Sequence, residues 1–410
     1  MGRSTAREDG PVRPPTVVAA MSGTGNPGPT AARAPDPVRA PSVQRSVQRS
    51  VQPSVRSCRM TVVLSAGPPI EPQSYAVGRS STVLVDPAHP DRSLAIDCWY
   101  PAEGSHRSDS LYELLPGIGF TASASADAPA VPGPHPVVVW SHGRSGTRSS
   151  YAMLCEGLAA RGYVVVAPDH PGDTLGDWLT GAAVDDDTNE VQRADDMRRV
   201  LDATLGGGLL GAGAGPSSAP EVDVGRVAVA GHSYGAHTAF ALAGADRPDP
   251  RVHAVAGLQS FTRTLRRSVL ARVEIPCLLV AGAADATTPP VTDADRAFAA
   301  LGSRDARRID VEHAGHQACS DVGLYLELAP RVDGLPELVG EFLQGLADQV
   351  TGTAGDPWRP TVGLHLRALG AWLDDVFDRD PERAVRDMEQ VSGAPGVTVT
   401  SRRVPAGGGS

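Results

Sequence analysis

Short apolar runs alternate with helix-like stretches along most of the chain after about residue 60. The apolar runs predict strands at 81–85, 94–99, 137–140, 163–167, 226–230, 252–258 and 276–281, with a weaker strand at 307–312. Helical spacing predicts helices at 150–160 and 190–205. Strands that are apolar on both faces and alternate with helices are typical of a mostly parallel sheet covered by helices on both sides. The pattern therefore predicts an α/β fold, with functional residues beyond the C-terminal ends of the strands.

The two ends of the chain depart from this pattern. Residues 1–60 are rich in Pro, Ser, Arg and Gly and contain the repeat SVQR-SVQR-SVQP-SVRS at 42–57. Such a segment has too little apolar surface to offset the entropy of ordering it, so a disordered extension is predicted. Two interpretations of this segment stay open: it is a basic tail that binds an anionic surface, or it is an extension that precedes a true start of the protein at Met60. The domain is expected at 61–378, followed by a tail at 379–410 with one short helix at 381–390.

The charge and the cysteine content indicate which classes of partner and which cellular compartment fit this sequence. The net charge is −10, but residues 1–60 hold nine Arg and three acidic residues, which leaves 28 basic and 44 acidic residues in the remainder. An acidic body argues against nucleic acid as a partner. Five scattered cysteines fit a reducing compartment better than a disulfide framework. No signal-peptide pattern and no apolar stretch long enough for a bilayer are found, so a cytoplasmic protein is predicted.

One short motif suggests a nucleophile. Gly-His-Ser-Tyr-Gly at 231–235 follows the apolar run 227–230 and precedes a helix-like run. This is the G-x-S-x-G pattern in the strand, turn and helix context of a nucleophile elbow. The tight turn strains the middle residue and requires small neighbours, which Gly231 and Gly235 provide. Ser233 is therefore the predicted nucleophile, and chance occurrence of so short a pattern is the alternative.

A serine nucleophile requires a base and a carboxylate that orients the base, in the chain order Ser, acid, His. Asp285 comes just past the predicted strand 276–281 and is the predicted acid. The next strand is followed by two histidines. His316, after a glycine, is preferred as the base over His313, for which packing at the strand end is the expected role.

The second part of a serine hydrolase site is a pair of backbone N–H groups that bind the oxyanion. The amide of Tyr234 follows the nucleophile directly. His142-Gly143 ends the predicted strand 137–140, so the amide of Arg144 can point to the same place. Arg144 and Tyr234 are the predicted oxyanion donors.

A metal site is the competing interpretation of the last loop. His313, His316 and Cys319 have i, i+3, i+6 spacing. Three ligands in one short loop without a second cluster do not match the usual zinc patterns. No metal is therefore predicted, and Cys319 is expected to be a small apolar filler near the site.

Five segments together carry a resemblance to a known family. WSHGRSG at 140–146, APDHPG at 167–172, AGHSYGA at 230–236, the Asp285 turn and AGHQACSD at 314–321 resemble the plasma-type platelet-activating factor acetylhydrolases. This family is a branch of the α/β-hydrolases, whose bacterial relatives include dienelactone-hydrolase-like and polyester-cleaving enzymes. The resemblance spans about residues 75–377. It implies an α/β-hydrolase fold, with a triad of Ser233, Asp285 and His316.

The resemblance also implies the chemistry and leaves the substrate open. It implies direct hydrolysis of a small-molecule ester or lipid through an acyl-enzyme, without cofactor, metal or Ca²⁺. Short-chain acyl esters such as platelet-activating-factor-like phospholipids are the leading substrate class, and polyester or xenobiotic esters are the alternative. A non-catalytic binding protein on a hydrolase scaffold is the less favoured hypothesis. The oligomeric state is not predicted.

The surroundings of the site differ from the family in places. Ala236 stands where a second glycine is common, and Cys319 stands where an aromatic residue is frequent, which affects the acyl pocket rather than the triad. The stretch 260–274 is too short for a large cap domain. Helical segments at 321–348, in the long insert before a terminal helix at 362–377, are therefore expected to line the site.

Overall fold

The computed structural model describes residues 62–403, apart from 87–88, 105–108, 116–117, 210–218 and 352–356. These residues belong to one compact unit, Cys58–Ser410. The predicted disordered extension at 1–60, with its repeat and with Met60, lies outside the described residues. In the part of the chain that is described, no helix is both long and apolar enough to cross a membrane.

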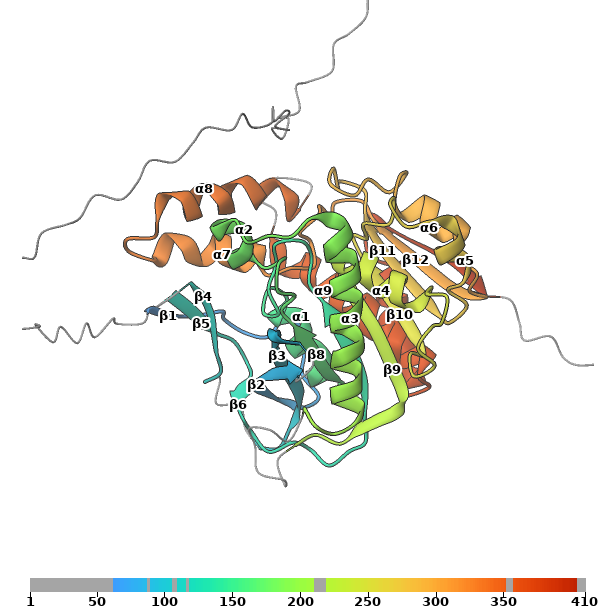
Figure 1. The fold of residues 1–410 in the computed structure, drawn as a ribbon, viewed down its shortest axis with the longest axis horizontal. Coiled ribbons are helices and arrows are strands. Elements are labelled where there is room, and N and C mark those ends of the chain that lie inside the picture. Colours follow the sequence, from blue (N-terminus) through green and yellow to red (C-terminus); the bar gives the residue numbers. More distant parts are fainter. Residues whose placement is uncertain are drawn as a thin grey trace, which may run out of the picture. The chain divides into compact units, whose positions relative to one another are not determined.

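A large, mostly parallel sheet forms the centre of the domain (Figure 1). Its strands, in spatial order, are β13 (Val397–Arg403), β12 (Asp305–Val311), β11 (Cys277–Gly282), β10 (Ala254–Leu258), β9 (Val222–His232), β7 (His135–Ser141), β8 (Val164–Pro168), β3 (His89–Ala102), β2 (Ala76–Asp86) and β6 (Ser125–Ala126). The strands from β12 to β8 run parallel. β2 and β3 form a long antiparallel hairpin beside β8. The predicted α/β class is thus confirmed.

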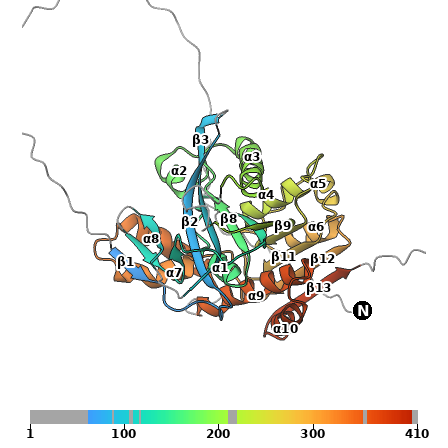
Figure 2. The same cartoon turned by 90° about the horizontal axis from the view of Figure 1, so that it is seen from below.

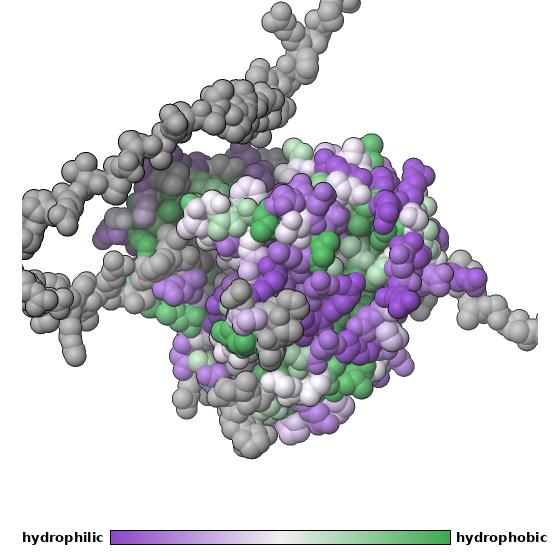
Figure 3. Space-filling view, viewed as in Figure 1, coloured by the Kyte–Doolittle hydropathy of each residue, from purple (hydrophilic) through white to green (hydrophobic). Residues whose placement is uncertain are grey.

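Helices cover both faces of this sheet (Figure 2). One face packs against α1 (Ala152–Ala160), α9 (Trp358–Val376) and α10 (Pro381–Ser392), and the other packs against α3 (Asp186–Leu205), α4 (Tyr234–Ala243), α5 (Arg267–Ala271) and α6 (Ala294–Ala300). Side chains alternate along a strand, so Val138 of β7 enters the first core and Val139 the second. The outward face of α3, at the centre of Figure 3, is mostly hydrophilic. Fully buried strands explain the continuous apolar runs in the sequence.

A smaller sheet and a helical insert lie side by side near one end of the large sheet (Figures 1 and 2). The sheet consists of β1 (Val62–Ser65), β5 (Ile118–Thr121) and β4 (Leu111–Leu115). The insert contains α7 (Val322–Leu328), the 3₁₀ turns η1 (Ala329–Arg331) and η2 (Ala347–Gln349), and α8 (Glu337–Leu346). The remaining short helix, α2 (Leu175–Thr180), lies near them. The stretch 260–274 holds only the five-residue α5, in line with the expected lack of a large cap domain.

The C-terminal segment differs from the expected tail. The predicted helix is present as α10, but the residues after it form β13, which pairs antiparallel with β12 along its whole length. Val391, Val397 and Val399 pack against the core of the first face. The alternation of Val and Thr at 397–400 is a strand pattern that the sequence analysis overlooked. The described part of 379–410 is therefore part of the packed domain, and its last strand belongs to the sheet.

Candidate active site

Ser233 lies in a strained turn between β9 and α4. Its backbone angles are φ 52° and ψ −116°, a region that residues with a side chain rarely adopt. A Cβ on Gly231 would lie 2.4 Å from the backbone of Gly235, and one on Gly235 would lie 1.9 Å from the carbonyl oxygen of Ser141. Only glycine fits at either position. The sequence motif thus forms the elbow that was predicted from it, and the strain is typical of functional sites.

Three side chains predicted from the sequence form one chain of hydrogen bonds. Oγ of Ser233 lies 3.0 Å from Nε2 of His316, and Nδ1 of His316 lies 2.8 Å from Oδ2 of Asp285. These residues follow β9, β12 and β11, whose C-terminal ends share one edge of the parallel sheet. Because Asp285 accepts from Nδ1, the free Nε2 lone pair can face the Ser233 hydroxyl. This is the geometry of a serine hydrolase triad.

The Asp285 carboxylate is held ionised by its neighbours. Oδ1 accepts the backbone N–H groups of Thr287 and Thr288, each at 2.8 Å, and Oδ2 accepts the Thr288 hydroxyl at 2.6 Å. Burial alone would raise the pKa of Asp285. The hydrogen bond from His316, the charge of His316 and the hydrogen bonds from Thr288 outweigh burial and lower this pKa below its ordinary value of 3.8. The carboxylate can therefore orient and stabilise a protonated imidazole.

The structure separates the two histidines of the last loop. The side chain of His313 is 66% exposed and lies 3.8 Å from Glu312. Cys319 is fully buried. Among the described residues, no group of three or more His, Cys, Asp and Glu side chains could hold a metal ion. Of these two histidines, His316 is the one that forms a hydrogen bond with Ser233.

The amides of Arg144 and Tyr234 are available beside the serine. Tyr234 is the first residue of α4, and Arg144 lies in the loop after β7. A Cβ on Gly143 would come within 3.4 Å of Cβ of Ser233, so this loop runs against the nucleophile. Neither amide has a hydrogen-bond partner in the described part of the chain. The Arg144 side chain turns elsewhere, to Asp186 at 2.5 Å and over the Tyr234 ring at 4.6 Å.

A tyrosine and a histidine join the loop after β7 to the base. The Gly143 N–H donates to the Tyr151 hydroxyl at 3.1 Å, which lies 2.6 Å from Nδ1 of His232. Nε2 of His232 donates to the carbonyl oxygen of His316 at 2.7 Å. Burial and the neighbouring His316 lower the pKa of His232 to about 3, so its ring is neutral. Since Gly143 N–H is already engaged, Arg144 is the donor left free in this loop.

An apolar cavity of about 440 Å³ opens over the serine. Residues of α7 and α8 at helical spacing line it: Val322, Tyr325, Leu328, Val339, Phe342, Leu343 and Leu346. Leu64 of β1, Ile118 of β5 and Trp178 of α2 also line it, as do Ser233 and His316. The helical insert thus supplies the lining that was expected from 321–348. A substrate group bound here would be largely removed from water.

Several residues around the site have no counterpart in the sequence analysis. They are Tyr151, His232, Asp173, Thr288 and Arg193. His232 lies inside the elbow motif, and Thr288 follows the acid at the spacing of an Asx turn, so both carried a local signal. Arg193 sits on an amphipathic helix, where an arginine normally marks the solvent side, and only the tertiary structure shows that it is buried.

Comparison with known proteins gives partial matches. The chlorophyllase family model matches residues 123–257, a span that contains the Arg144 loop and Ser233 but ends before Asp285 and His316. The chain is 33% identical over 114 residues to chlorophyllase-1 (chloroplastic) of Citrus unshiu and to that of Citrus sinensis. Each alignment covers 28% of this chain, and the chain spans only 30% of the length of these relatives.

A solved structure matches over more of the chain. The ferulic acid esterase of Streptomyces cinnamoneus has 25% sequence identity and a TM-score of 0.56, with 76% of this chain and 92% of that chain covered. None of the relatives named here is a platelet-activating factor acetylhydrolase, so they support the wider superfamily and not that branch. The chain has the α/β-hydrolase fold and is related to the esterases of that superfamily.

Proposed function

We propose that this protein is a serine-type carboxylic ester hydrolase. The observation that carries the proposal is the hydrogen-bonded chain from Ser233 through His316 to Asp285, of which the serine and the histidine line an apolar cavity. The similarity to chlorophyllases and to a ferulic acid esterase supports ester cleavage. All three members are present and connected, which makes a non-catalytic scaffold the weaker interpretation.

The proposed reaction passes through an acyl-enzyme. Nε2 of His316 takes the Ser233 proton as Oγ attacks the ester carbonyl, and Asp285 stabilises the imidazolium. The amides of Arg144 and Tyr234 receive the oxyanion, where loss of one donor costs on the order of 100-fold in rate. His316 then gives its proton to the leaving alcohol, and a water that it deprotonates releases the acid from Ser233.

The cavity supports an ester with one sizeable apolar group. Its walls are mostly aliphatic and aromatic side chains of α7, α8 and the small sheet. A short acyl group on an alcohol that carries a long alkyl chain, as in platelet-activating-factor-like phospholipids, is the candidate that the sequence resemblance suggests. An ester with a bulky apolar acyl or aryl group, including polyester fragments and xenobiotic esters, is the second candidate, and the apolar character of the cavity favours it.

Initial rates on p-nitrophenyl esters of increasing acyl length test the proposal, with 1-alkyl-2-acetyl-glycerophosphocholine as the lipid substrate. Ser233→Ala is the control for each substrate. We expect turnover and labelling by a fluorophosphonate probe in the wild type, and neither in Ser233→Ala. A wild type that is no faster than its mutant on every ester, and is not labelled, would overturn the proposal and favour the scaffold interpretation or another substrate class.

A further inference from the structure

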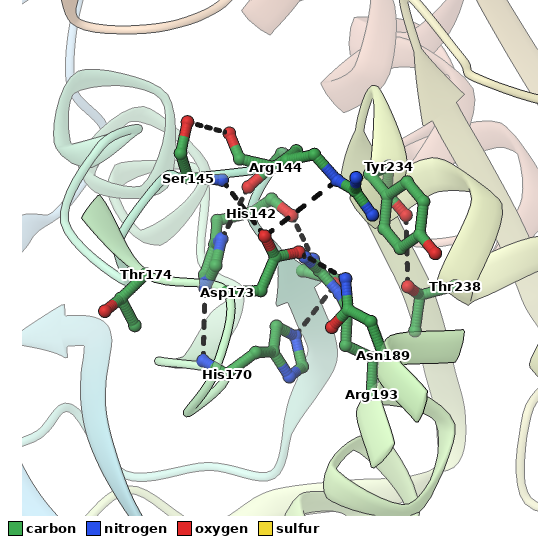
Figure 4. Close-up of polar contacts among 12 residues, drawn as sticks. His142, Arg144, Ser145, His170, Asp173, Thr174, Asn189, Arg193, Tyr234 and Thr238 are labelled. Carbon is green, nitrogen blue, oxygen red and sulfur yellow. Dashed lines mark hydrogen bonds and ion pairs between the residues drawn. The ribbon is translucent and has the colours of Figure 1, made fainter. Parts of the chain in front are cut away.

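We propose that His142 and the buried ion pair between Arg193 and Asp173 position the oxyanion loop, which comprises residues 143–146. They would act as positioning residues, because they aim the Arg144 amide without touching the substrate. The inference rests on the proposed function. Figure 4 shows this cluster, in which His142, Asp173 and Arg193 converge beneath the loop from three separate segments of the chain.

The direction of the Arg144 N–H is set by the carbonyl group of the preceding residue, Gly143. The Gly143 C=O and the Arg144 N–H belong to one planar trans peptide unit, so they point in opposite directions. The Gly143 carbonyl accepts Nδ1–H of His142 at 2.7 Å and the backbone N–H of Gly146 at 3.0 Å. Two donors on this carbonyl fix the plane of the peptide. Its amide is thereby held in one direction.

The His142 ring has one tautomer that satisfies both of its contacts. Nε2 accepts the backbone N–H of His170 at 3.1 Å, which leaves the proton on Nδ1, facing Gly143. Burial and the charge of Arg193 lower the pKa of His142 well below its ordinary value of 6.5. A second proton would remove the acceptor for His170. The neutral Nδ1–H form is therefore the one that this environment stabilises.

The ion pair holds the two sides of the loop at once. Arg193 donates from Nη2 to the His142 carbonyl and, at 3.0 Å, to Oγ of Ser141. Its other nitrogen, Nη1, lies 2.6 Å from Oδ2 of Asp173. Oδ1 of Asp173 accepts the backbone N–H of Ser145 at 3.3 Å. One charged pair thus contacts the residues on both sides of Gly143 and Arg144.

Ser145 is held by these contacts in a backbone conformation that it would not adopt by itself. Its φ is +54°, a left-handed value that costs a residue with a side chain about 1 kcal/mol or more. The Asp173 contact to its amide and the bond from its own hydroxyl to the Arg144 carbonyl, at 2.7 Å, offset that cost. Without them the loop is free to relax, and the Arg144 amide would lose its direction.

The same arginine also contacts the second oxyanion donor. The Arg193 guanidinium lies 5.3 Å from the centre of the Tyr234 ring, and the amide of Tyr234 is the other predicted donor. Arg193 has no exposed side-chain surface, and Asp173 is almost fully buried. Buried ion pairs often add little net stability compared with apolar residues of similar volume. A role in placing the two donors explains this pair better than stability does.

The test combines removal of the contacts with a conservative replacement. His142→Leu loses the donor to the Gly143 carbonyl, whereas the amide of His142→Asn can replace it. Asp173→Asn neutralises the ion pair. Asp374→Asn is the matched control, because Asp374 is a fully buried carboxylate that pairs with Arg161 at 2.7 Å on the other face of the sheet. For each protein, kcat, KM, the fluorophosphonate labelling rate and the melting temperature are measured.

We expect kcat and the labelling rate to fall about 100-fold in His142→Leu and Asp173→Asn, with KM within about threefold of the wild type. His142→Asn should regain about tenfold of the loss. Asp374→Asn should melt earlier yet keep its kcat. Unchanged kcat in folded His142→Leu and Asp173→Asn, or equal loss in Asp374→Asn, would overturn the positioning role. A wild type without Ser233-dependent turnover would instead overturn the proposed function, and this role with it.

Discussion

The Tyr151 hydroxyl lies 2.6 Å from Nδ1 of His232, the residue directly before the predicted nucleophile. The same hydroxyl accepts the Gly143 N–H, and the other side of the His232 ring donates to the His316 carbonyl. A single line of hydrogen bonds therefore runs from the oxyanion loop to the backbone of the base. Because the His232 ring is neutral, its Nδ1 accepts from the Tyr151 hydroxyl while its Nε2 donates to the His316 carbonyl.

Removal of the Tyr151 hydroxyl should slow the reaction without unfolding the chain. Tyr151→Phe leaves Nδ1 of His232 and the Gly143 N–H without their partner, so we expect kcat to fall about tenfold, the effect of losing buried hydrogen bonds. Tyr163→Phe, which removes another buried hydroxyl, one bonded to Asp374, is the control. Equal kcat values for the two variants would argue against the link.

Orientation of the acid should depend on a threonine as well as on the carboxylate. Asp285→Asn removes the charge that stabilises the imidazolium and should lower kcat about 10⁴-fold. Thr288→Val removes the 2.6 Å bond to Oδ2 and should lower kcat about tenfold. Thr292→Val, at an exposed hydroxyl outside the site, should leave the rate unchanged. A Thr288→Val enzyme as fast as Thr292→Val would contradict this support of Asp285.

The helical insert should set the size of the apolar group that is accepted. Leu343 of α8 lines the cavity, and Leu343→Trp would reduce its volume. We expect kcat/KM to fall at least about tenfold for long or bulky p-nitrophenyl esters and to change little for the acetyl ester. Gln344→Trp, at an exposed position of the same helix that does not line the cavity, is the control. Equal losses on all esters would place the apolar group elsewhere.

Acid should destabilise the fold below about pH 6.5. Burial lowers the pKa of His365 to about 4, and burial and His316 lower that of His232 to about 3, from an ordinary value of 6.5. Below pH 6.5 the unfolded chain binds protons that the folded chain excludes. The free energy of unfolding therefore decreases as the pH decreases, by up to about 1.4 kcal/mol per pH unit for each histidine.

Melting temperatures between about pH 7.5 and pH 5 check this linkage. We expect a steady fall in the wild type and a shallower fall in His365→Leu, which has one fewer group to protonate on unfolding. His313→Asn, at an exposed position, should follow the wild-type curve. Parallel curves for all three proteins would show that burial of His365 does not contribute to acid sensitivity.

The last strand should be needed for stability. Deletion of everything after Gly396 removes β13 and exposes the edge of β12, which is a template for association with other chains. We expect a lower melting temperature and aggregation, measured by light scattering. A chain that ends at Arg403 is the control. Identical melting and scattering of the two truncations would make β13 dispensable.

Local sequence was sufficient for most of the sheet and for the candidate triad. Runs apolar on both faces identified the parallel strands, and the elbow required glycines at 231 and 235, because no Cβ fits there. The acid and the base could be found because each follows a strand, and the ends of parallel strands meet at one edge of the sheet. β13 was missed because its pairing with β12 joins residues 86 to 98 positions apart, and its pattern of Val and Thr is short.

The tertiary structure alone decided which side chains from distant segments of the chain lie together. The sequence could not show that Arg193 turns inward, because its place on α3 is compatible with either side of an amphipathic helix until the loop after β7 packs against it. The cavity depends likewise on distant segments, because α8 and β1, about 280 residues apart in the chain, both line it. Strands, turns and the order of the triad follow from short-range sterics and burial. The aim of the oxyanion loop and the shape of the cavity depend on which distant segments pack together.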